Sequence, residues 1–172
     1  GTRQLPLSVA QALGACAGWA GYGIAGRSRR VVWEQLTDAF GSRLSDHTRT
    51  YVARRVFTNL GRLIMEWFVL DRMSLAEVER FVEVRGLGHL TRALEQGRGV
   101  VMISAHFGNW EVLPMTLSAK GFKGGVLARP LRYPEYQRFL WGMRQRKGVP
   151  TYDSRSLKDV ARVLAQNHII GI

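Results

Sequence analysis

The first half of the chain carries apolar positions at helical spacing. Between residues 46 and 70, apolar side chains recur every three or four positions, which predicts one long amphipathic helix. A short second helix is predicted over residues 74–81, because its first residue, a serine, and Glu77 have the spacing of a capping box. A third helix is expected over residues 90–96, where a glycine follows it.

The second half of the chain alternates short apolar runs with helical segments. Strands are expected at residues 99–104, 125–128, 149–152 and 169–172, and helices in the segment ending near 120 and at 134–147 and 156–166. This alternation predicts an α/β fold: N-terminal amphipathic helices, then a mixed, partly parallel sheet with flanking helices. Because the last run is apolar up to the final residue, we expect the C-terminal part of the domain to lie beyond this sequence.

The N-terminal segment has a different pattern, since residues 5–26 contain no charge and an arginine cluster begins at Arg27. Such a stretch is long enough for a bilayer core, which needs roughly 20 apolar residues, but glycines and polar residues dilute it. A basic cluster after an uncharged stretch is typical of a cytoplasmic flank. We therefore predict a membrane-associating segment over residues 1–30, either a marginal anchor or an interfacial helix, followed by one domain over residues 31–172. A buried, glycine-rich core helix is the alternative.

The charge balance indicates which kinds of partner the chain is expected to bind. The chain has 25 Lys+Arg against 13 Asp+Glu, a formal net charge of +12, which favours anionic partners such as nucleic acid, anionic lipid or a phosphorylated substrate. The sequence contains no helix-turn-helix, zinc-binding or RNA-binding signature, so we expect no nucleic-acid partner. A basic nucleic-acid-binding protein, or an inactive membrane-surface protein, remains the alternative from a different class. With one cysteine, no intramolecular disulfide can form.

Candidate chemistry lies in residues 104–111, Ser-Ala-His-Phe-Gly-Asn-Trp-Glu, between a predicted strand and a helix. This is where ligands bind in open α/β sheets. His106 and Glu111 are five positions apart, about 140° on a regular helix, so they can meet only if the segment is an irregular turn, which Gly108 permits. Pro114 also favours a late start of the following helix. In such a turn Glu111 could orient the imidazole while its other nitrogen takes a proton from a hydroxyl group. A structural or merely exposed histidine is the alternative.

These residues resemble a known family. His-Phe-Gly-Asn-Trp-Glu is similar to the His-x4-Asp/Glu motif of glycerolipid-type acyltransferases, in the form seen in lipid A biosynthesis lauroyl/myristoyl acyltransferases and the related phosphatidylinositol mannoside acyltransferases. Further similar blocks are residues 57–62 with Glu66, residues 86–87 with the Ala-Leu-Glu-Gln-Gly-Arg-Gly run, Ala128-Arg129-Pro130 in place of a tyrosine-arginine-proline block, and residues 144–148. The family also carries an Asp-Gln segment just beyond the last predicted strand, where this sequence stops.

The resemblance implies an O-acyltransferase at the cytoplasmic face of the bacterial inner membrane. It would move a fatty acyl chain from an acyl carrier protein or coenzyme A thioester to a hydroxyl of a phosphorylated glycolipid, such as a lipid A precursor. Phosphatidylinositol mannoside or another glycolipid is the alternative acceptor. The thioester is a co-substrate, and no bound cofactor or metal is implied.

The same resemblance implies roles for individual residues. His106 would be the general base and Glu111 its orienting partner. Arg129 would bind a phosphate or stabilise developing negative charge, which an arginine does well in a dry site. Arg144 and Asn109 are further candidates for substrate binding, although Asn109 could serve only to shape the turn.

Overall fold

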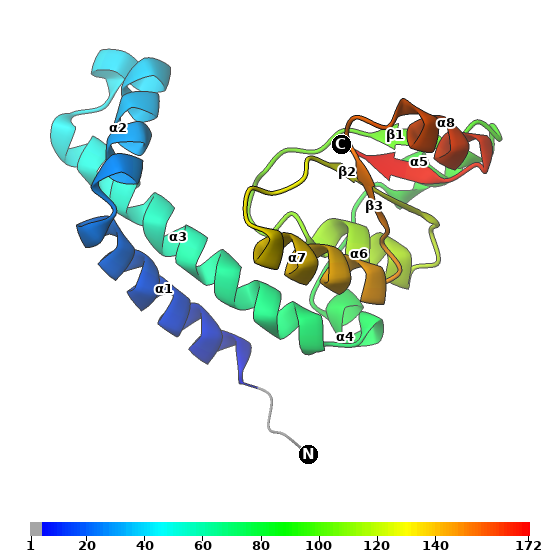
Figure 1. The fold of residues 1–172 in the computed structure, drawn as a ribbon, viewed down its shortest axis with the longest axis horizontal. Helices are drawn as coiled ribbons and strands as arrows, with labels where there is room; N and C mark the ends of the chain where they lie inside the picture. The colour runs from blue at the N-terminus through cyan, green and yellow to red at the C-terminus, as the bar shows by residue number, and fades with distance from the viewer. Residues whose placement is uncertain (1–4) are drawn as a thin grey trace. The chain divides into compact units, whose positions relative to one another are not determined.

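The computed structural model describes residues 5–172 and divides the chain into two compact units. The first unit ends at Arg72 and the second runs from Met73 to Ile172. The first is made of helices and the second contains a parallel sheet with flanking helices, so the predicted α/β class is confirmed (Figure 1). The expected end of the membrane-associating segment, residue 30, falls inside the second helix of the first unit.

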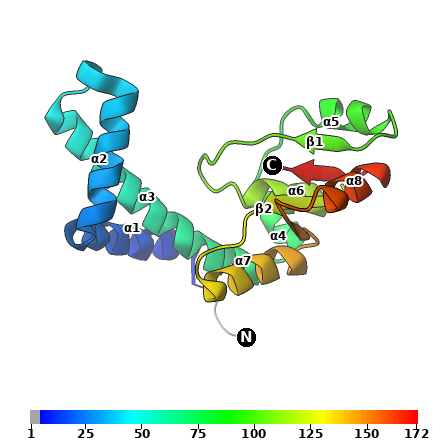
Figure 2. The same ribbon diagram turned by 45° about the horizontal axis from the view of Figure 1, so that its top comes forward.

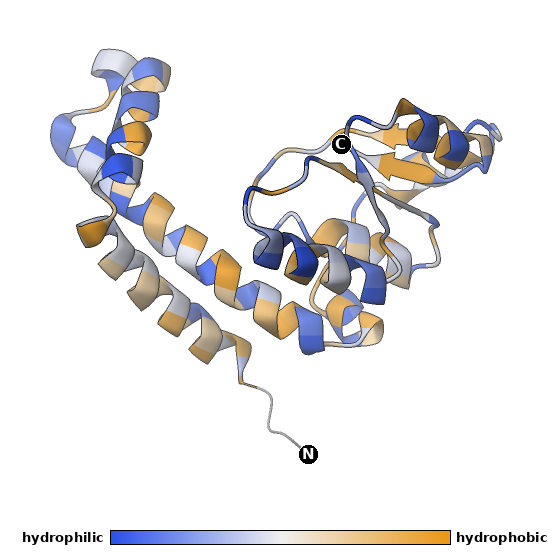
Figure 3. Cartoon of the chain, in the orientation of Figure 1, coloured by the Kyte–Doolittle hydropathy of each residue, from blue (hydrophilic) through white to orange (hydrophobic). Residues whose placement is uncertain are grey.

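Over residues 5–72, the first unit contains three α-helices and one short 3-10 helix. They are α1 (Leu7–Ile24), α2 (Gly26–Phe40), η1 (Gly41–Arg43) and α3 (Asp46–Arg72). The long helix predicted from residue 46 is therefore confirmed, and it extends slightly past its expected end. Figure 3 shows orange and pale residues along α1, whereas strongly hydrophilic residues gather on α2 and at intervals along α3.

Close packing of glycines joins α1 to α3. A Cβ atom added at Gly14 or at Gly61 would collide with the backbone carbonyl of the other, and one added at Gly18 would collide with the carbonyl of Phe57. Such contact between backbones is possible only because these positions lack a side chain. The ring of Tyr22 completes the contact edge-on against Phe57, with centroids 5.5 Å apart.

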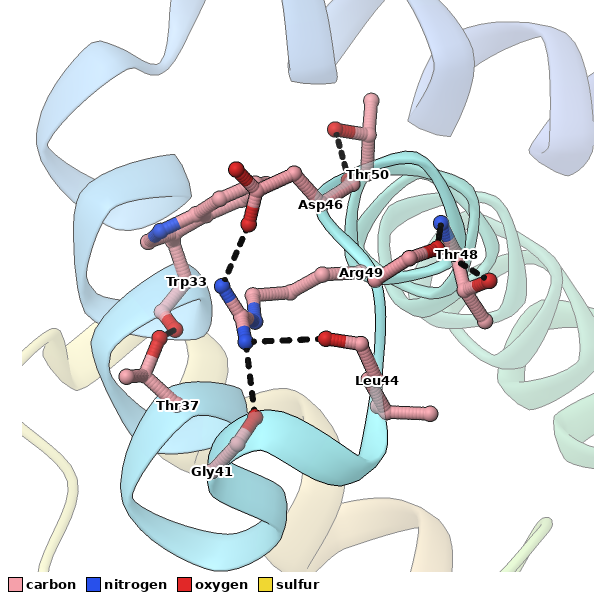
Figure 4. A network of polar contacts seen from close by, with 9 residues as sticks. Trp33, Thr37, Gly41, Leu44, Asp46, Thr48, Arg49 and Thr50 are labelled. Carbon is pink, nitrogen blue, oxygen red and sulfur yellow. Dashed lines mark hydrogen bonds and ion pairs between the residues drawn. The ribbon is translucent and has the colours of Figure 1, made fainter.

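A buried guanidinium group lies at the joint between α2 and α3 (Figure 4). Arg49 donates hydrogen bonds to the carbonyls of Gly41 and Leu44, at 2.9 and 3.1 Å, and pairs with the Asp46 carboxylate at 2.8 Å. Its charge lies 5.2 Å from the centre of the Trp33 ring. Arg49 therefore satisfies carbonyls that the end of α2 and the following turn leave open.

One sequence-based alternative for α1 concerns the membrane. Within residues 5–172, no helix combines the length and the apolar character that crossing a bilayer requires. One side of α1 packs in the glycine contact with α3, as the core-helix alternative predicts, and Ala10 and Gly14 are buried there.

The second unit is built on four parallel strands. They are β1 (Val100–Met102), β2 (Gly124–Ala128), β3 (Thr151–Asp153) and β4 (Ile169–Gly171), in the spatial order β1-β4-β2-β3. All four expected strands are present, and each pairing is parallel. The carboxyl ends of the strands therefore lie along one edge of the sheet, where loops that bind ligands are usually found.

Five helices accompany this sheet. They are α4 (Leu75–Arg80), α5 (Leu87–Leu94), α6 (Val112–Ala119), α7 (Pro134–Arg146) and α8 (Leu157–Ala165). The capping box predicted for α4 is present, since the Ser74 side chain accepts from the backbone of Glu77, whose carboxylate accepts from the backbone of Ser74. Figures 1 and 2 show α6 and α7 together on one side of the strands, whereas α8 packs beside β4 (Figure 2).

The largest boundary difference concerns α5, which begins at Leu87 rather than at residue 90. Gly86 adopts a left-handed conformation with φ 81°, which turns the chain directly into the helix. The sequence predicts a glycine turn before this helix, but the apolar pattern marked only the first strongly periodic residue and placed the helix start three positions too late.

The glycine contact leads to a prediction about the first unit. Gly14→Ala should lower the free energy of unfolding by about 1–3 kcal/mol, because the new methyl group has no space against α3. Gly23→Ala on the same helix is the matched control, since a Cβ atom there meets nothing within 4 Å. Better helix propensity should make it neutral or stabilising by up to about 1 kcal/mol. Urea unfolding monitored by circular dichroism measures both, and equal effects would contradict the close packing.

Candidate active site

The candidate site lies in the connection between β1 and α6. Residues 103–109 have no regular structure, a turn follows, and α6 begins only at Val112. Gly108 has φ 57°, a left-handed conformation that favours glycine. Pro114 falls in the first turn of α6, where its missing N–H costs no helical hydrogen bond. The predicted irregular turn and late helix start are therefore both confirmed.

His106 is exposed on this turn and lies against an aromatic ring. The imidazole and the Trp110 ring have centroids 4.8 Å apart, with their planes inclined by 52°. The neighbouring Phe107 side chain is 90% exposed. The turn thus presents an accessible imidazole beside apolar surface, an arrangement that can receive a hydroxyl substrate with an apolar body.

Glu111, in contrast, is buried, with a residue exposure of 1%. Its carboxylate pairs with the guanidinium of Arg144 through two hydrogen bonds. Arg144 Nε donates to Oε2 at 2.7 Å and Nη2 donates to Oε1 at 2.5 Å. The Arg144 side chain is itself only 11% exposed. This is the two-pronged geometry in which an arginine–carboxylate pair is strongest, and it compensates a charge that would otherwise be costly to bury.

The geometry differs here from the expected contact between Glu111 and His106. In the described structure, residues 5–172, His106 makes no hydrogen bond to Glu111. Both carboxylate oxygens of Glu111 instead accept hydrogen bonds from the guanidinium group of Arg144. The residues of the ion pair are 33 positions apart, on different elements. Local spacing along the chain could not reveal that pairing.

Two arginines at the carboxyl ends of β2 and β3 have different electrostatic surroundings. Arg155 donates to the Asp153 carboxylate through Nε at 3.0 Å and through Nη2 at 2.6 Å. Hydrogen bonds from the Arg155 side chain and backbone lower the pKa of Asp153 to about 2. Arg129, directly after β2, is exposed and makes no hydrogen bond or ion pair within the described part of the chain. Its charge is therefore open to an anionic ligand.

Asn109 lies within the turn and is half-buried. Its backbone carbonyl accepts a hydrogen bond from Val112 N at 3.2 Å, which closes the turn before α6. This position fits a role in shaping the turn, and a contact between its side chain and a substrate stays a prediction.

The chain is similar in sequence to proteins of known function. The family model for "Bacterial lipid A biosynthesis acyltransferase" matches residues 1–172. The chain is also 27% identical, over 176 residues, to a lipid A biosynthesis lauroyltransferase of Escherichia coli (strain K12). That alignment covers 97% of this chain and 54% of the relative, so the chain spans about half the length of that protein.

The buried ion pair leads to a prediction about stability. Glu111→Ala should lower the free energy of unfolding of this unit by about 3–5 kcal/mol, because it leaves the Arg144 charge buried without compensation. The matched control is Glu135→Ala, which removes the carboxylate of the exposed Glu135–Arg138 pair on α7. It should leave the unfolding transition unchanged, since exposed pairs contribute little. Denaturant titration measures both, and equal transitions would contradict the burial of Glu111.

Proposed function

Because the chain belongs to the bacterial lipid A biosynthesis acyltransferases, we propose that it transfers a fatty acyl group from a thioester to a hydroxyl of a phosphorylated glycolipid. The observation that carries this proposal is the exposed His106 at the carboxyl end of β1, within a His-x4-Glu motif. The acceptor class follows from the family and from the basic chain, whose net charge of +12 attracts phosphorylated partners.

His106 acts as the general base in this reaction. The imidazole takes the proton of the acceptor hydroxyl while its oxygen attacks the thioester carbonyl carbon. The carbon–sulfur bond then breaks, the new ester bond remains on the glycolipid, and the leaving sulfur receives the proton from the imidazolium. This sequence needs no redox step and no metal ion, and the accessible imidazole leaves room for both substrates.

The remaining site residues hold the substrates and the turn. Arg129 offers an uncompensated charge at the same edge of the sheet, which suits a phosphate group or the oxyanion that develops on the carbonyl. Asn109 supports the turn from within and contacts the acceptor from its half-buried position. Glu111 orients the turn that carries His106, and its buried ion pair with Arg144 supports this role.

The donor is the thioester of acyl carrier protein or coenzyme A. A lauroyl thioester is the first donor to test, because the relative from Escherichia coli is named for lauroyl transfer. Both donor carriers are anionic, so each would be attracted by the excess of basic residues on this chain.

We further propose that α1 lies at the surface of the bacterial inner membrane, on its cytoplasmic side. Apolar side chains are exposed along α1: Val9, Leu13, Trp19 and Ile24 are 42, 52, 67 and 87% exposed. Arg27, Arg29 and Arg30 follow at once, on α2. An uncharged apolar face with tryptophan and adjacent arginines is typical of a helix bound in the plane of an anionic membrane surface.

The catalytic proposal is tested by acyl transfer in detergent with the full-length protein. Lauroyl-acyl carrier protein and lauroyl-coenzyme A are each offered with a phosphorylated lipid A precursor, and labelled ester product is quantified. His106→Ala should reduce the rate by about a hundredfold or more, as expected for loss of a positioned general base. His89→Ala, an exposed histidine on α5, is the control and should transfer at the wild-type rate. Full activity of His106→Ala would contradict the proposal.

The membrane proposal is tested by sedimentation with lipid vesicles. Binding should be stronger to vesicles containing anionic phospholipid than to phosphatidylcholine alone. A Trp19→Ser/Ile24→Ser variant should bind about tenfold or more weakly, because it removes apolar surface from the bound face. Leu157→Ser, which removes an equally exposed apolar side chain from α8, should bind like the wild type. Equal losses in both variants would contradict a specific role for α1.

A further inference from the structure

We infer that Arg144 is a positioning residue that acts through Glu111 and does not bind substrate. The inference rests on the proposed acyl transfer at His106 and gives Arg144 a different role from the substrate contact that the family resemblance implied. It follows from three observations: the geometry of the ion pair, its attachment to the sheet, and its burial.

The geometry makes Glu111 a fixed carboxylate. The planar fork of Arg144 contacts both oxygens, at 2.7 and 2.5 Å, so the carboxylate cannot rotate without losing a bond. A lysine in the same place could satisfy only a point contact. Glu111 ends the turn that carries His106 and immediately precedes α6. Fixing its carboxylate therefore fixes one end of the segment from which the imidazole projects.

Arg144 is in turn attached to the opposite part of the sheet. It lies in the last turn of α7, and its carbonyl accepts a hydrogen bond from Val149 N at 2.9 Å. Its Nη1 approaches Thr151 Oγ1 at 3.4 Å, at the first residue of β3. Because β1 and β3 are the two edges of the sheet, the pair connects the turn after one edge strand to the segment before the other. No other ion pair among the described residues joins these two segments.

Burial argues against a contact between Arg144 and a substrate. The Arg144 side chain is 11% exposed and its partner carboxylate 1%. A phosphate could take both prongs of this fork only by displacing Glu111, which would then be buried without a counter-charge. Arg129, by comparison, is exposed and has no ion-pair partner in residues 5–172, so an anionic substrate would meet it first.

A double-mutant cycle on steady-state transfer by the full-length protein tests this inference. Glu111→Gln, Arg144→Gln and the double variant are compared with the wild type for kcat and for KM of donor and acceptor. Each single change should reduce kcat by about a hundredfold, the cost expected when reacting groups are misplaced by about 1 Å. Both KM values should stay within about threefold of the wild type, and the double variant should lie within about threefold of the lower single one, because residues that act as a unit are not additive.

A matched cycle on the exposed pair of α7, Glu135→Gln with Arg138→Gln, is the control and should leave kcat unchanged. Arg144→Lys covers the case in which Arg144→Gln does not fold. It keeps the charge but loses the fork, so it should unfold at a temperature near that of the wild type while kcat falls by about tenfold.

Three results would overturn the inference. The first is a raised KM for the phosphorylated acceptor with unchanged kcat in Arg144→Gln, which would make Arg144 a substrate contact. The second is a loss of kcat in the double variant that equals the product of the two single losses. The third is a wild-type kcat in Arg144→Lys. His106→Ala, assayed in parallel, separates this inference from the proposed function. Loss of transfer in His106→Ala with normal kcat in Arg144→Lys rejects only the positioning role, whereas normal transfer in His106→Ala rejects the proposed reaction.

Discussion

A carboxylate with 1% exposure can be tolerated in the folded chain only if a cation accompanies it, and this constraint organises the candidate site. Arg144 supplies that cation from α7, with Thr151 of β3 beside it. The pair holds together the β1–α6 turn and the α7–β3 connection, which are far apart in sequence. The exposed turn that carries His106 is therefore supported by a largely buried ion pair.

The charged residues of the candidate site and its surroundings are of two kinds, buried and accessible. Glu111 and Arg144 compensate each other inside the protein, and Asp153 compensates Arg155 at the surface. The Arg129 side chain, directly after β2, is exposed to solvent. Chemistry that needs a base and an anion-binding group can use the accessible residues, while the compensated pairs keep the loops in place.

The first unit shows how one helix can fit two sequence-based alternatives. The glycine-lined side of α1 packs against α3, with Gly14 in direct contact with Gly61, as a core helix would. The same helix exposes apolar residues such as Trp19 and Ile24, as an interfacial helix would. From composition alone, the core helix and the interfacial helix are competing explanations, because composition does not show which residues share a face of the helix. The helical period places Gly14 and Gly18 on the side that packs against α3, whereas Trp19 is exposed.

The sequence by itself determined most of the secondary structure of this protein. Every expected strand formed, the capping box at Ser74 formed, and the glycine turn before α6 was visible because Gly108 and Pro114 act on the backbone locally. The sequence also indicated the family, because the His-x4-Glu motif and several further blocks resemble it together. These features depend on neighbouring residues, so a linear pattern records them.

Only the tertiary structure decided the strand order and the partner of Glu111. The sequence placed Glu111 beside His106, because the two share a motif, yet the carboxylate turns to a guanidinium 33 positions away. Burial selects that partner: a charge removed from water binds the cation that the fold brings within reach, and the fold depends on packing of distant elements. Local spacing contains no information about which helix end will lie beside the turn, so this contact appears only once the sheet has assembled.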